Sequence, residues 1–245
     1  MKAPGFAGGF VTLGLSVPPV LRRYTPEPVY IIERFDRVVD NTGRTQRRHI
    51  IDACQLLNKS RTFKYKTATL QTLAQIVDYC RNRVNTRLSL YRWLVFNLLL
   101  ANTDNHLKNL SFLVSAEGIE LAPSYDLLST GTYHTRAFAN ERASWPAVEL
   151  AIELPGATTL ATVTRESILS AGNVLGLPRR IGERELDRLT RNLLPALNAL
   201  EQRIERENVD YPEPVRVFLG AERRLVSTIK RIIVRDMLER LNAAR

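Results

Sequence analysis

An eight-residue polar loop constrains this chain more than any other feature of its sequence. The loop spans residues 102–109 and reads NTDNHLKN. It lies between an apolar stretch typical of a buried helix and an alternating stretch typical of a β-hairpin. Within the loop, Asp104 and Asn109 stand five residues apart, and Asp126 follows the hairpin about twenty residues beyond Asp104. A carboxylate, an amide and a second carboxylate around one hairpin suit a hard cation such as Mg²⁺.

The order and spacing of these three residues match the catalytic loop and metal-binding residues of protein kinases. Phosphoryl transfer needs a carboxylate at the acceptor hydroxyl and oxygen ligands that hold magnesium against the nucleotide phosphates. In that interpretation His106 and Lys108 are able to face phosphate oxygens. Each residue alone has a plainer explanation, because Asp and Asn often form turns and Asp126 could cap a following helix. Their combination around one hairpin favours phosphoryl transfer.

Composition places the chain among ordinary globular proteins. Its 245 residues are 44% hydrophobic and 24% charged, which is enough for a full core in one large domain or two small ones. No apolar run approaches the roughly 20 residues of a membrane span, and no signal peptide is evident, so we expect no membrane contact. Cys54 and Cys80 fit neither a metal site nor a disulfide scaffold. Their pattern favours a reducing cytoplasm.

The net charge of +10 favours contact with phosphate-rich partners. The alternative is an ordinary basic surface, because the charges are spread along the chain rather than gathered in one long block. No clear helix-turn-helix pattern supports a DNA-binding regulator.

Periodicity along the chain predicts a mostly α-helical fold with a small sheet. Residues 29–33 are β-branched and aromatic, which is typical of a strand, and residues 50–57 have an apolar spacing that suits a short helix. Residues 70–84 and 89–101 predict two helices, of which the second is the more buried. From residue 160 onward the pattern is helical.

Several segments before and around the loop share one family pattern. They are residues 14–18 (GLSVP), 30–37 (YIIERFDR), 49–55 (HIIDACQ) with Lys64-Tyr65, 102–112 (NTDNHLKNLSF) and 121–129 (LAPSYDLLS). Together they resemble the HipA family of bacterial serine/threonine kinase toxins. The resemblance implies a protein-kinase-like C-lobe of the HipA type, mainly α with a small β component, with the N-lobe largely missing.

The resemblance divides the chain into two parts. Residues 1–28 would form a link and a remnant of the N-lobe, and residues 29–245 would form the C-terminal kinase domain. Within that domain, residues 29–37 would be the hinge, residues 102–129 the catalytic loop and hairpin, and residues 160–245 a helical tail.

The resemblance also implies a role for each residue of the site in an ATP- and Mg²⁺-dependent kinase. Asp104 would be the catalytic base, and Asn109 and Asp126 would hold Mg²⁺. The residues expected to bind ATP are Glu33, Arg34, Phe35, His106, Leu107, Lys108, Asn109, Tyr125 and Asp126.

Within the hinge, the backbone from Glu33 to Phe35 would bind the adenine. The side chains of Arg34 and Arg37 would form ion pairs instead of touching ATP, and Asp36 would order the segment.

Partners and completeness follow from the same resemblance. Family members phosphorylate a protein substrate, in known cases an aminoacyl-tRNA synthetase, and pair with a HipB-like helix-turn-helix antitoxin that binds operator DNA. Their Gly-rich phosphate loop and strand lysine precede the hinge, where this chain has only about thirty residues. Neither Lys2 nor the glycine-rich stretch 5–9 is assigned those roles. We therefore expect weak or undetectable ATP turnover by this chain alone. The alternative is an inactive truncated toxin that acts as an antitoxin- or DNA-complex-binding module.

Overall fold

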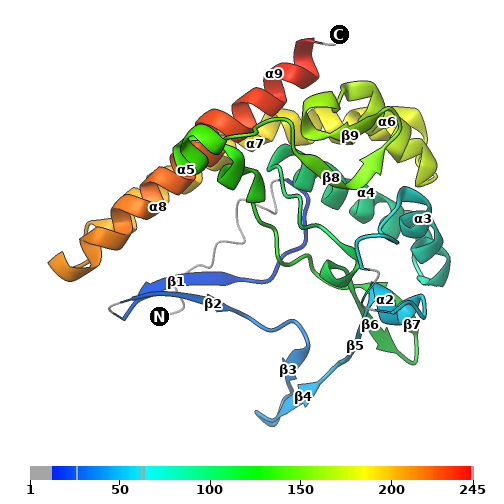
Figure 1. Ribbon diagram of the computed structural model, residues 1–245. Coiled ribbons are helices and arrows are strands. Elements are labelled where there is room, and N and C mark those ends of the chain that lie inside the picture. The colour runs from blue at the N-terminus through cyan, green and yellow to red at the C-terminus, as the bar shows by residue number, and fades with distance from the viewer. Residues whose placement is uncertain (1–12, 26, 61, 63, 244–245) are drawn as a thin grey trace.

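The computed structural model describes residues 13–25, 27–60, 62 and 64–243, and Figure 1 shows helices above a set of strands. Lys2 and the glycine-rich stretch 5–9 lie outside the described residues. The strands are β1 (Val20–Tyr24), β2 (Pro28–Ile32), β3 (Arg37–Val39), β4 (Thr45–Arg47), β5 (His49–Asp52), β6 (Ser111–Ser115), β7 (Gly118–Leu121), β8 (Glu149–Leu154) and β9 (Ala157–Thr159).

The α-helices are α2 (Ala53–Leu56), α3 (Leu70–Tyr79), α4 (Arg83–Leu99), α5 (Arg136–Ala139), α6 (Arg165–Val174), α7 (Arg179–Asn208), α8 (Arg216–Thr228) and α9 (Arg235–Ala243). Short 3₁₀ turns are η2 (Leu107–Asn109), η3 (Thr130–His134), η4 (Asn140–Arg142), η5 (Leu160–Thr162) and η6 (Glu213–Val215), and η7 (Ile229–Val234) is a π-helix. The described part is therefore mainly helical with a small β component, as the sequence predicts.

The centre of the hydrophobic core is α4. Every residue in its C-terminal part, residues 93–99, is buried, and Leu90, Tyr91, Leu94, Val95 and Leu99 are fully buried. A stretch of helix that is buried all round must be covered on every side. Its neighbours in the fold are α3, α6 and α7. The loop that follows α4 therefore leaves a rigid, buried element.

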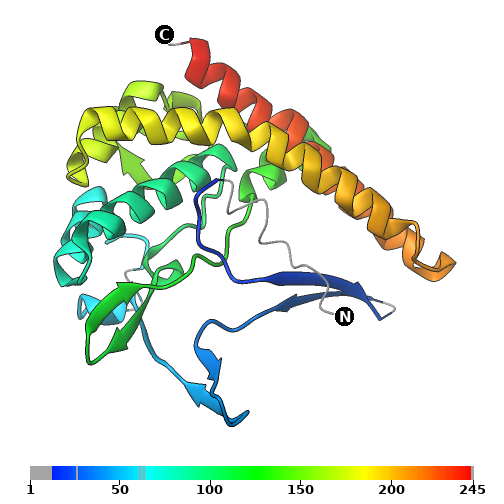
Figure 2. The same cartoon turned by 180° about the vertical axis from the view of Figure 1, so that it is seen from behind.

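A long helical pair covers one side of this core. In Figures 1 and 2, α8, η7 and α9 form one continuous rod that runs back along α7. From residue 160 to residue 243 the described elements are all helical, as periodicity predicts. No helix among the described residues is long and apolar enough to cross a membrane.

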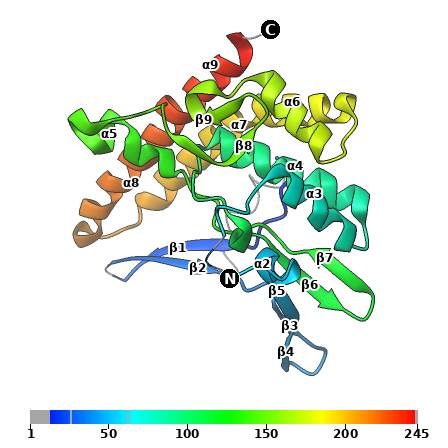
Figure 3. The ribbon, with the colours of Figure 1, turned by 45° about the vertical axis from the view of Figure 1, so that its right-hand side comes forward.

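The sheet that carries the hairpin is three-stranded and antiparallel, in the order β5-β6-β7. Phe112 in the central strand β6 is fully buried and lies opposite Ile51 in β5 and Leu121 in β7. The backbone N–H of Arg81, just after α3, donates to Ile119 O of β7 at 3.0 Å. Figure 3 shows this sheet and α2 beneath α3 and α4. The predicted hairpin is confirmed, with its turn before Gly118.

Three predicted helices have different limits in the structure. The helix predicted for residues 50–57 was wrong in its first part, because residues 49–52 form β5 and only Ala53–Leu56 is helical. Two successive β-branched isoleucines pair there with the hairpin, and the side chain of Asp52 accepts from the backbone N–H of Gln55 at 2.9 Å to start α2. The helix predicted for residues 70–84 is shorter, because α3 ends at Tyr79. The side chain of Asn82 caps the next helix, so α4 begins at Arg83, before the predicted start at residue 89.

Candidate active site

The loop begins where α4 ends in a left-handed residue. Ala101 has φ 51°, its N–H donates to Leu98 O at 3.0 Å, and the N–H of Asn102 donates to Asn97 O at 2.8 Å. This pair of bonds is the Schellman arrangement, which satisfies the last carbonyls of a helix and turns the chain away from its axis. The loop therefore starts in a fixed direction.

Asn102 ties the loop to the segment after the hairpin. Its side chain is buried, and Nδ2 donates to Asn97 Oδ1 at 2.8 Å and to the carbonyl of Asp126 at 3.3 Å. Its Oδ1 accepts from the N–H of Asp104 at 3.1 Å. The sequence pattern alone indicates no role for Asn102 or Asn97. The available signal is a polar residue, Asn97, inside the otherwise apolar run of residues 94–101, because buried amides need partners.

Asn109 brings together the three residues that the sequence singled out. Its amide is buried, and Nδ2 donates to the carbonyl of Asp104 and to Asp126 Oδ2, both at 3.0 Å. The backbone of Asp126 is also left-handed, with φ 55°, a conformation that Asp tolerates better than most residues. In the bonds between described residues, Asn109 Oδ1 stays free to act as an oxygen ligand.

The donor set fits a magnesium ion held mainly by a nucleotide. The described residues contain no group of three or more His, Cys, Asp or Glu side chains that could hold a metal. One amide oxygen and one exposed carboxylate, from Asn109 and Asp126, are a small share of an octahedral shell. Mg²⁺ commonly takes one or two protein ligands and completes its shell with phosphates and water.

Asp104 lies at the edge of the site with its side chain 40% exposed. The hydroxyl of Tyr65 donates to Asp104 Oδ1. This hydrogen bond, together with burial and the nearby carboxylate charges, raises the pKa of Tyr65 to about 12. Tyr65 belongs to a segment that resembles the family, but the sequence pattern indicates no role for it.

His106 lies behind Tyr65. The two rings meet edge to face with centroids 4.9 Å apart, and His106 Nε2 is 2.8 Å from Lys64 Nζ. Burial, and then the Lys64 charge, lower the pKa of His106, so the neutral ring accepts from the lysine. Its other nitrogen, Nδ1, is buried without a hydrogen-bond partner among the described residues. The predicted contact of His106 with ATP stays a prediction.

The next two loop residues point in different directions. Leu107 is fully buried in the hydrophobic core, so its side chain has no exposed surface to offer a nucleotide in this structure. Lys108 reaches back to β5 and donates to Asp52 Oδ2 at 3.1 Å, with its side chain 40% exposed. Leu107 could therefore contact ATP only through its backbone. Lys108 could use its backbone, or its ammonium group once that group has left Asp52.

An aromatic pair joins the predicted hinge to the segment that follows the hairpin. The ring of Phe35 stacks on that of Tyr125, and the hydroxyl of Tyr125 donates to Lys108 O at 2.6 Å. Burial raises the pKa of Tyr125. Ser111 Oγ lies 2.7 Å from the same hydroxyl. The adenine-binding prediction for Phe35 and the nucleotide prediction for Tyr125 thus fall on neighbouring side chains.

Arg34 and Arg37 of the predicted hinge form ion pairs with Asp36, as the sequence predicts. Arg34 Nε donates to Asp36 Oδ1 at 2.8 Å, and Arg37 pairs with the same carboxylate. These bonds lower the pKa of Asp36, with the hydrogen bond from Arg34 as the largest cause. The N–H of Glu33 already donates to Pro19 O at 2.9 Å. The backbone of Glu33, one of the three residues predicted to bind adenine, can therefore offer a ligand only its carbonyl.

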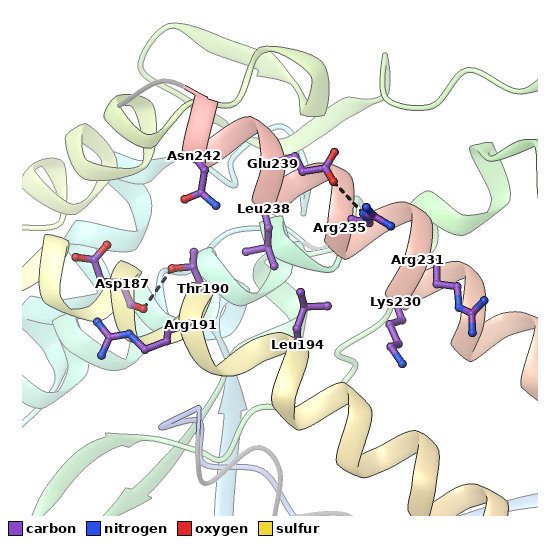
Figure 4. Close-up of a pocket in the computed structure, with 10 residues that line it drawn as sticks. All are labelled: Asp187, Thr190, Arg191, Leu194, Lys230, Arg231, Arg235, Leu238, Glu239 and Asn242. Carbon is purple, nitrogen blue, oxygen red and sulfur yellow. Dashed lines mark hydrogen bonds and ion pairs between the residues drawn. The ribbon is translucent and has the colours of Figure 1, made fainter.

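One cavity of the structure lies away from the loop. It measures about 620 Å³ between α7 and the rod of η7 and α9, with Leu194 and Leu238 facing each other across it (Figure 4). Its lining includes no residue of the loop, the hairpin or the hinge. It is therefore no part of the arrangement around Asp104.

The fold and the loop together define a kinase-like lobe. The chain belongs to the HipA-like C-terminal domain family, whose model matches residues 10–193. It is 30% identical over 181 residues to the serine/threonine-protein kinase toxin HipA of Shewanella oneidensis, covering 68% of this chain and 40% of that protein. It is 38% identical over 127 residues to the putative kinase Y4mE of Sinorhizobium fredii, covering 49% of this chain and 30% of that protein.

Solved structures agree with this family. A structure of the Shewanella oneidensis MR-1 toxin–antitoxin system, HipA with HipB and operator DNA, matches with a TM-score of 0.70 and 25% identity, over 96% of this chain and 55% of that one. The Helicobacter pylori proinflammatory kinase CtkA matches with a TM-score of 0.53 and 15% identity, over 96% of this chain and 84% of that one, which shows the fold alone. The chain spans less than half the length of the curated relatives.

Proposed function

We propose that this chain forms the catalytic-loop and metal-binding part of an ATP- and Mg²⁺-dependent serine/threonine protein kinase of the HipA toxin type. The observation that carries the proposal is the amide of Asn109, which donates at 3.0 Å both to the carbonyl of Asp104 and to the carboxylate of Asp126. One side chain thereby holds the proposed base and the proposed metal ligands in one fixed arrangement, which phosphoryl transfer requires.

Each residue has a definite part in the proposed reaction. The oxygen of a serine or threonine hydroxyl bonds to the γ-phosphorus of ATP, and the bond from that phosphorus to the bridging oxygen of ADP breaks. Asp104 accepts the proton of the hydroxyl. When bound, Mg²⁺ neutralises charge on the β- and γ-phosphates. Asn109 Oδ1 and the Asp126 carboxylate are the oxygen ligands that this chain offers it.

The aromatic pair of Phe35 and Tyr125 supports a nucleotide position beside these ligands. A purine presents a large flat surface, and stacked rings at the hinge offer a matching apolar contact. The hinge backbone lies next to this pair and supplies hydrogen-bonding groups for the adenine edge. We therefore propose that ATP contacts all nine residues that the sequence predicts for it, and that Leu107 does so through its backbone.

The partners belong to the same proposal. The substrate would be a protein, as in family members that modify an aminoacyl-tRNA synthetase. A HipB-like antitoxin would bind the complete toxin and link it to DNA. The net charge of +10 suits a complex assembled on DNA, and the Shewanella structure contains a HipB and operator DNA.

A calorimetric titration with ATP tests the nucleotide and metal assignments. We expect ATP to bind only when MgCl₂ is present and to be released in EDTA. Asp126→Asn should weaken ATP binding at least about tenfold, because it removes a charged ligand of the metal. Glu117→Gln is the matched control, because Glu117 lies on the same hairpin with its side chain 75% exposed. Binding of ATP that ignores magnesium, or no binding, would favour the alternative of an inactive module that binds an antitoxin or a DNA complex.

Transfer of radiolabelled phosphate to a protein acceptor tests Asp104. Where transfer is detected, Asp104→Asn should lower its rate by about 10²-fold or more, because the amide cannot accept the proton. ATP binding should remain, since Asp104 is not among the proposed metal ligands. Equal transfer rates for the variant and the parent chain would contradict the assigned base.

A further inference from the structure

A second cavity opens beside the loop, at Thr103 and Tyr65. It measures about 510 Å³ and is formed by the loop on one side and the segment leading into β8 on the other. The residues that line it are Tyr65, Thr103, His134, Ser144, Ala147, Val148, Glu149, Leu150 and Ala151. The proposed binding of ATP and magnesium uses none of them.

Tyr65 connects this cavity to the proposed base. Its ring lines the cavity, while its hydroxyl donates to Asp104 Oδ1. A base must lie within hydrogen-bond reach of the hydroxyl that it deprotonates. An acceptor serine or threonine therefore has to take the same position on the carboxylate that the tyrosine hydroxyl holds.

The position of Tyr65 allows such an exchange. The residue is 45% exposed. Its contacts are the edge of the His106 ring and the ammonium of Lys64, which lies 4.7 Å from the centre of the phenol ring. His106 and Lys64 also hold each other through their 2.8 Å contact. Rotation of Tyr65 toward solvent would therefore open the way to Asp104 and leave its neighbours in place.

The charge of the cavity indicates what enters it. Glu149 is exposed at the start of β8 and forms no ion pair with any described residue. It is the only carboxylate in the lining, which contains no lysine or arginine. The protein as a whole carries +10. A negative wall in a positive protein selects for a basic group at that place.

We propose that this cavity receives the acceptor segment of a protein substrate, whose serine or threonine hydroxyl displaces that of Tyr65 from Asp104 while a neighbouring lysine or arginine pairs with Glu149. The inference rests on the proposed kinase function and adds the recognition of its substrate. Tyr65 is a positioning residue that holds Asp104 until the acceptor arrives.

Peptide binding, measured by fluorescence anisotropy without nucleotide, tests this inference. The probes are two short fluorescein-labelled peptides in which a serine lies between two arginines or between two glutamates. The purified chain should bind the arginine peptide at least about fivefold more tightly, the size expected for one partly exposed ion pair. The net charge alone predicts the opposite preference, so it cannot imitate this result.

Two lysine substitutions on the same strand separate local from overall charge. Glu149→Lys should reverse the preference, and Glu153→Lys should keep it, because Glu153 is also exposed on β8 but does not line the cavity. Both variants change the net charge equally. Equal affinity for the two peptides, no binding of either, or the same effect of both substitutions would overturn the proposal.

Tyr65→Phe tests the displacement. Without its hydroxyl the ring no longer competes for Asp104, so the arginine peptide should bind about threefold more tightly or better. If Tyr65 only supported the wall of the cavity, binding would stay the same or weaken, which would contradict the displacement. Magnesium-dependent ATP binding by the same preparations reports on the proposed function separately, so the cavity can fail while the nucleotide site stands.

Discussion

The ring of Phe35 stacks on the ring of Tyr125, with centroids 6.0 Å apart and ring planes inclined by 26°. Tyr125 is fixed by its bonds to Ser111 and to the carbonyl of Lys108. The predicted hinge therefore rests on a side chain that is itself bonded to the loop of residues 102–109 and to β6. Such a stacked pair contributes about 0.5–1.5 kcal/mol beyond its buried area.

Removing the Phe35 ring should loosen the hinge. Phe35→Ala is expected to weaken magnesium-dependent ATP binding by about three- to tenfold, because the loss of the stack frees the hinge and removes part of the adenine surface. Phe35→Tyr should bind as the parent chain does. Phe138→Ala is the control, since Phe138 pairs with Tyr133 in a different part of the fold. Unchanged ATP affinity in Phe35→Ala would argue against the hinge assignment.

Gly131 lies against the turn that starts the loop. Its N–H donates to Ala101 O at 2.8 Å, and a Cβ at this position would come within 2.6 Å of the Ala101 Cβ and 3.1 Å of Trp145 Cζ3. Gly131→Ala should therefore lower the free energy of unfolding by about 1–3 kcal/mol, as overpacking does. Urea denaturation measures this directly.

Gly220 provides the opposite case for the same substitution. It lies in α8, and a Cβ there would meet no atom within 4 Å. Gly220→Ala should raise the free energy of unfolding by about 0.5–1 kcal/mol, because alanine is the better helix former. If both alanine substitutions changed the free energy of unfolding in the same direction, the close approach of Gly131 to Ala101 would not be the reason that position 131 requires glycine.

The sequence predicted those parts of the fold that local periodicity determines. The apolar run of α4 reflects its burial, and the alternation in β6 and β7 reflects their two different faces. The sequence therefore predicts this helix and this hairpin correctly. β5 was mistaken for a helix because four residues are too few to separate the two periods. Its pairing with Phe112 and its neighbours, about sixty residues away, decided the outcome.

The candidate site divides in the same way. The spacing of Asp104, Asn109 and Asp126 was readable because these residues lie close in sequence around one hairpin. The partners of the loop were not readable from spacing. Tyr65 reaches Asp104 from a segment about forty residues away, and Asn102 works through buried amide bonds that depend on the packed fold.

Glu185 is a buried carboxylate that joins three parts of the chain. Its side chain is 4% exposed and accepts from Arg92 Nε at 2.9 Å and from Arg188 Nε at 3.0 Å. The same arginines donate to the carbonyls of Gly14 and Leu13. Glu185→Ala should lower the free energy of unfolding by about 3–5 kcal/mol, because it leaves partly buried cations without their counterion.

An exposed glutamate in a similar ion pair gives the comparison. Glu166 pairs with Arg179 with its side chain 63% exposed, so Glu166→Ala should change the free energy of unfolding by less than about 1 kcal/mol. Urea denaturation of the two variants side by side measures the difference. Losses of equal size would mean that burial does not govern the Glu185 cluster.

The hydroxyl of Tyr65 should titrate unusually late. Its hydrogen bond to Asp104 and the nearby carboxylate charge raise its pKa to about 12, against about 10 for an ordinary phenol. Near pH 11 only about a tenth of Tyr65 should be ionised, whereas an ordinary phenol would be about nine-tenths ionised. The Cζ resonance of labelled tyrosine, assigned with Tyr65→Phe, reports this ionisation.

The sign of the stability effect follows from the same pKa. The unfolded chain loses the Tyr65 proton near pH 10 and the folded chain keeps it to about pH 12. The stabilisation is therefore complete below pH 10 and is lost as the pH rises through 12. Asp104→Asn removes the carboxylate charge and should return the titration of Tyr65 toward pH 10. A Tyr65 resonance that titrates at the same pH in both proteins would show that its hydroxyl does not hold Asp104.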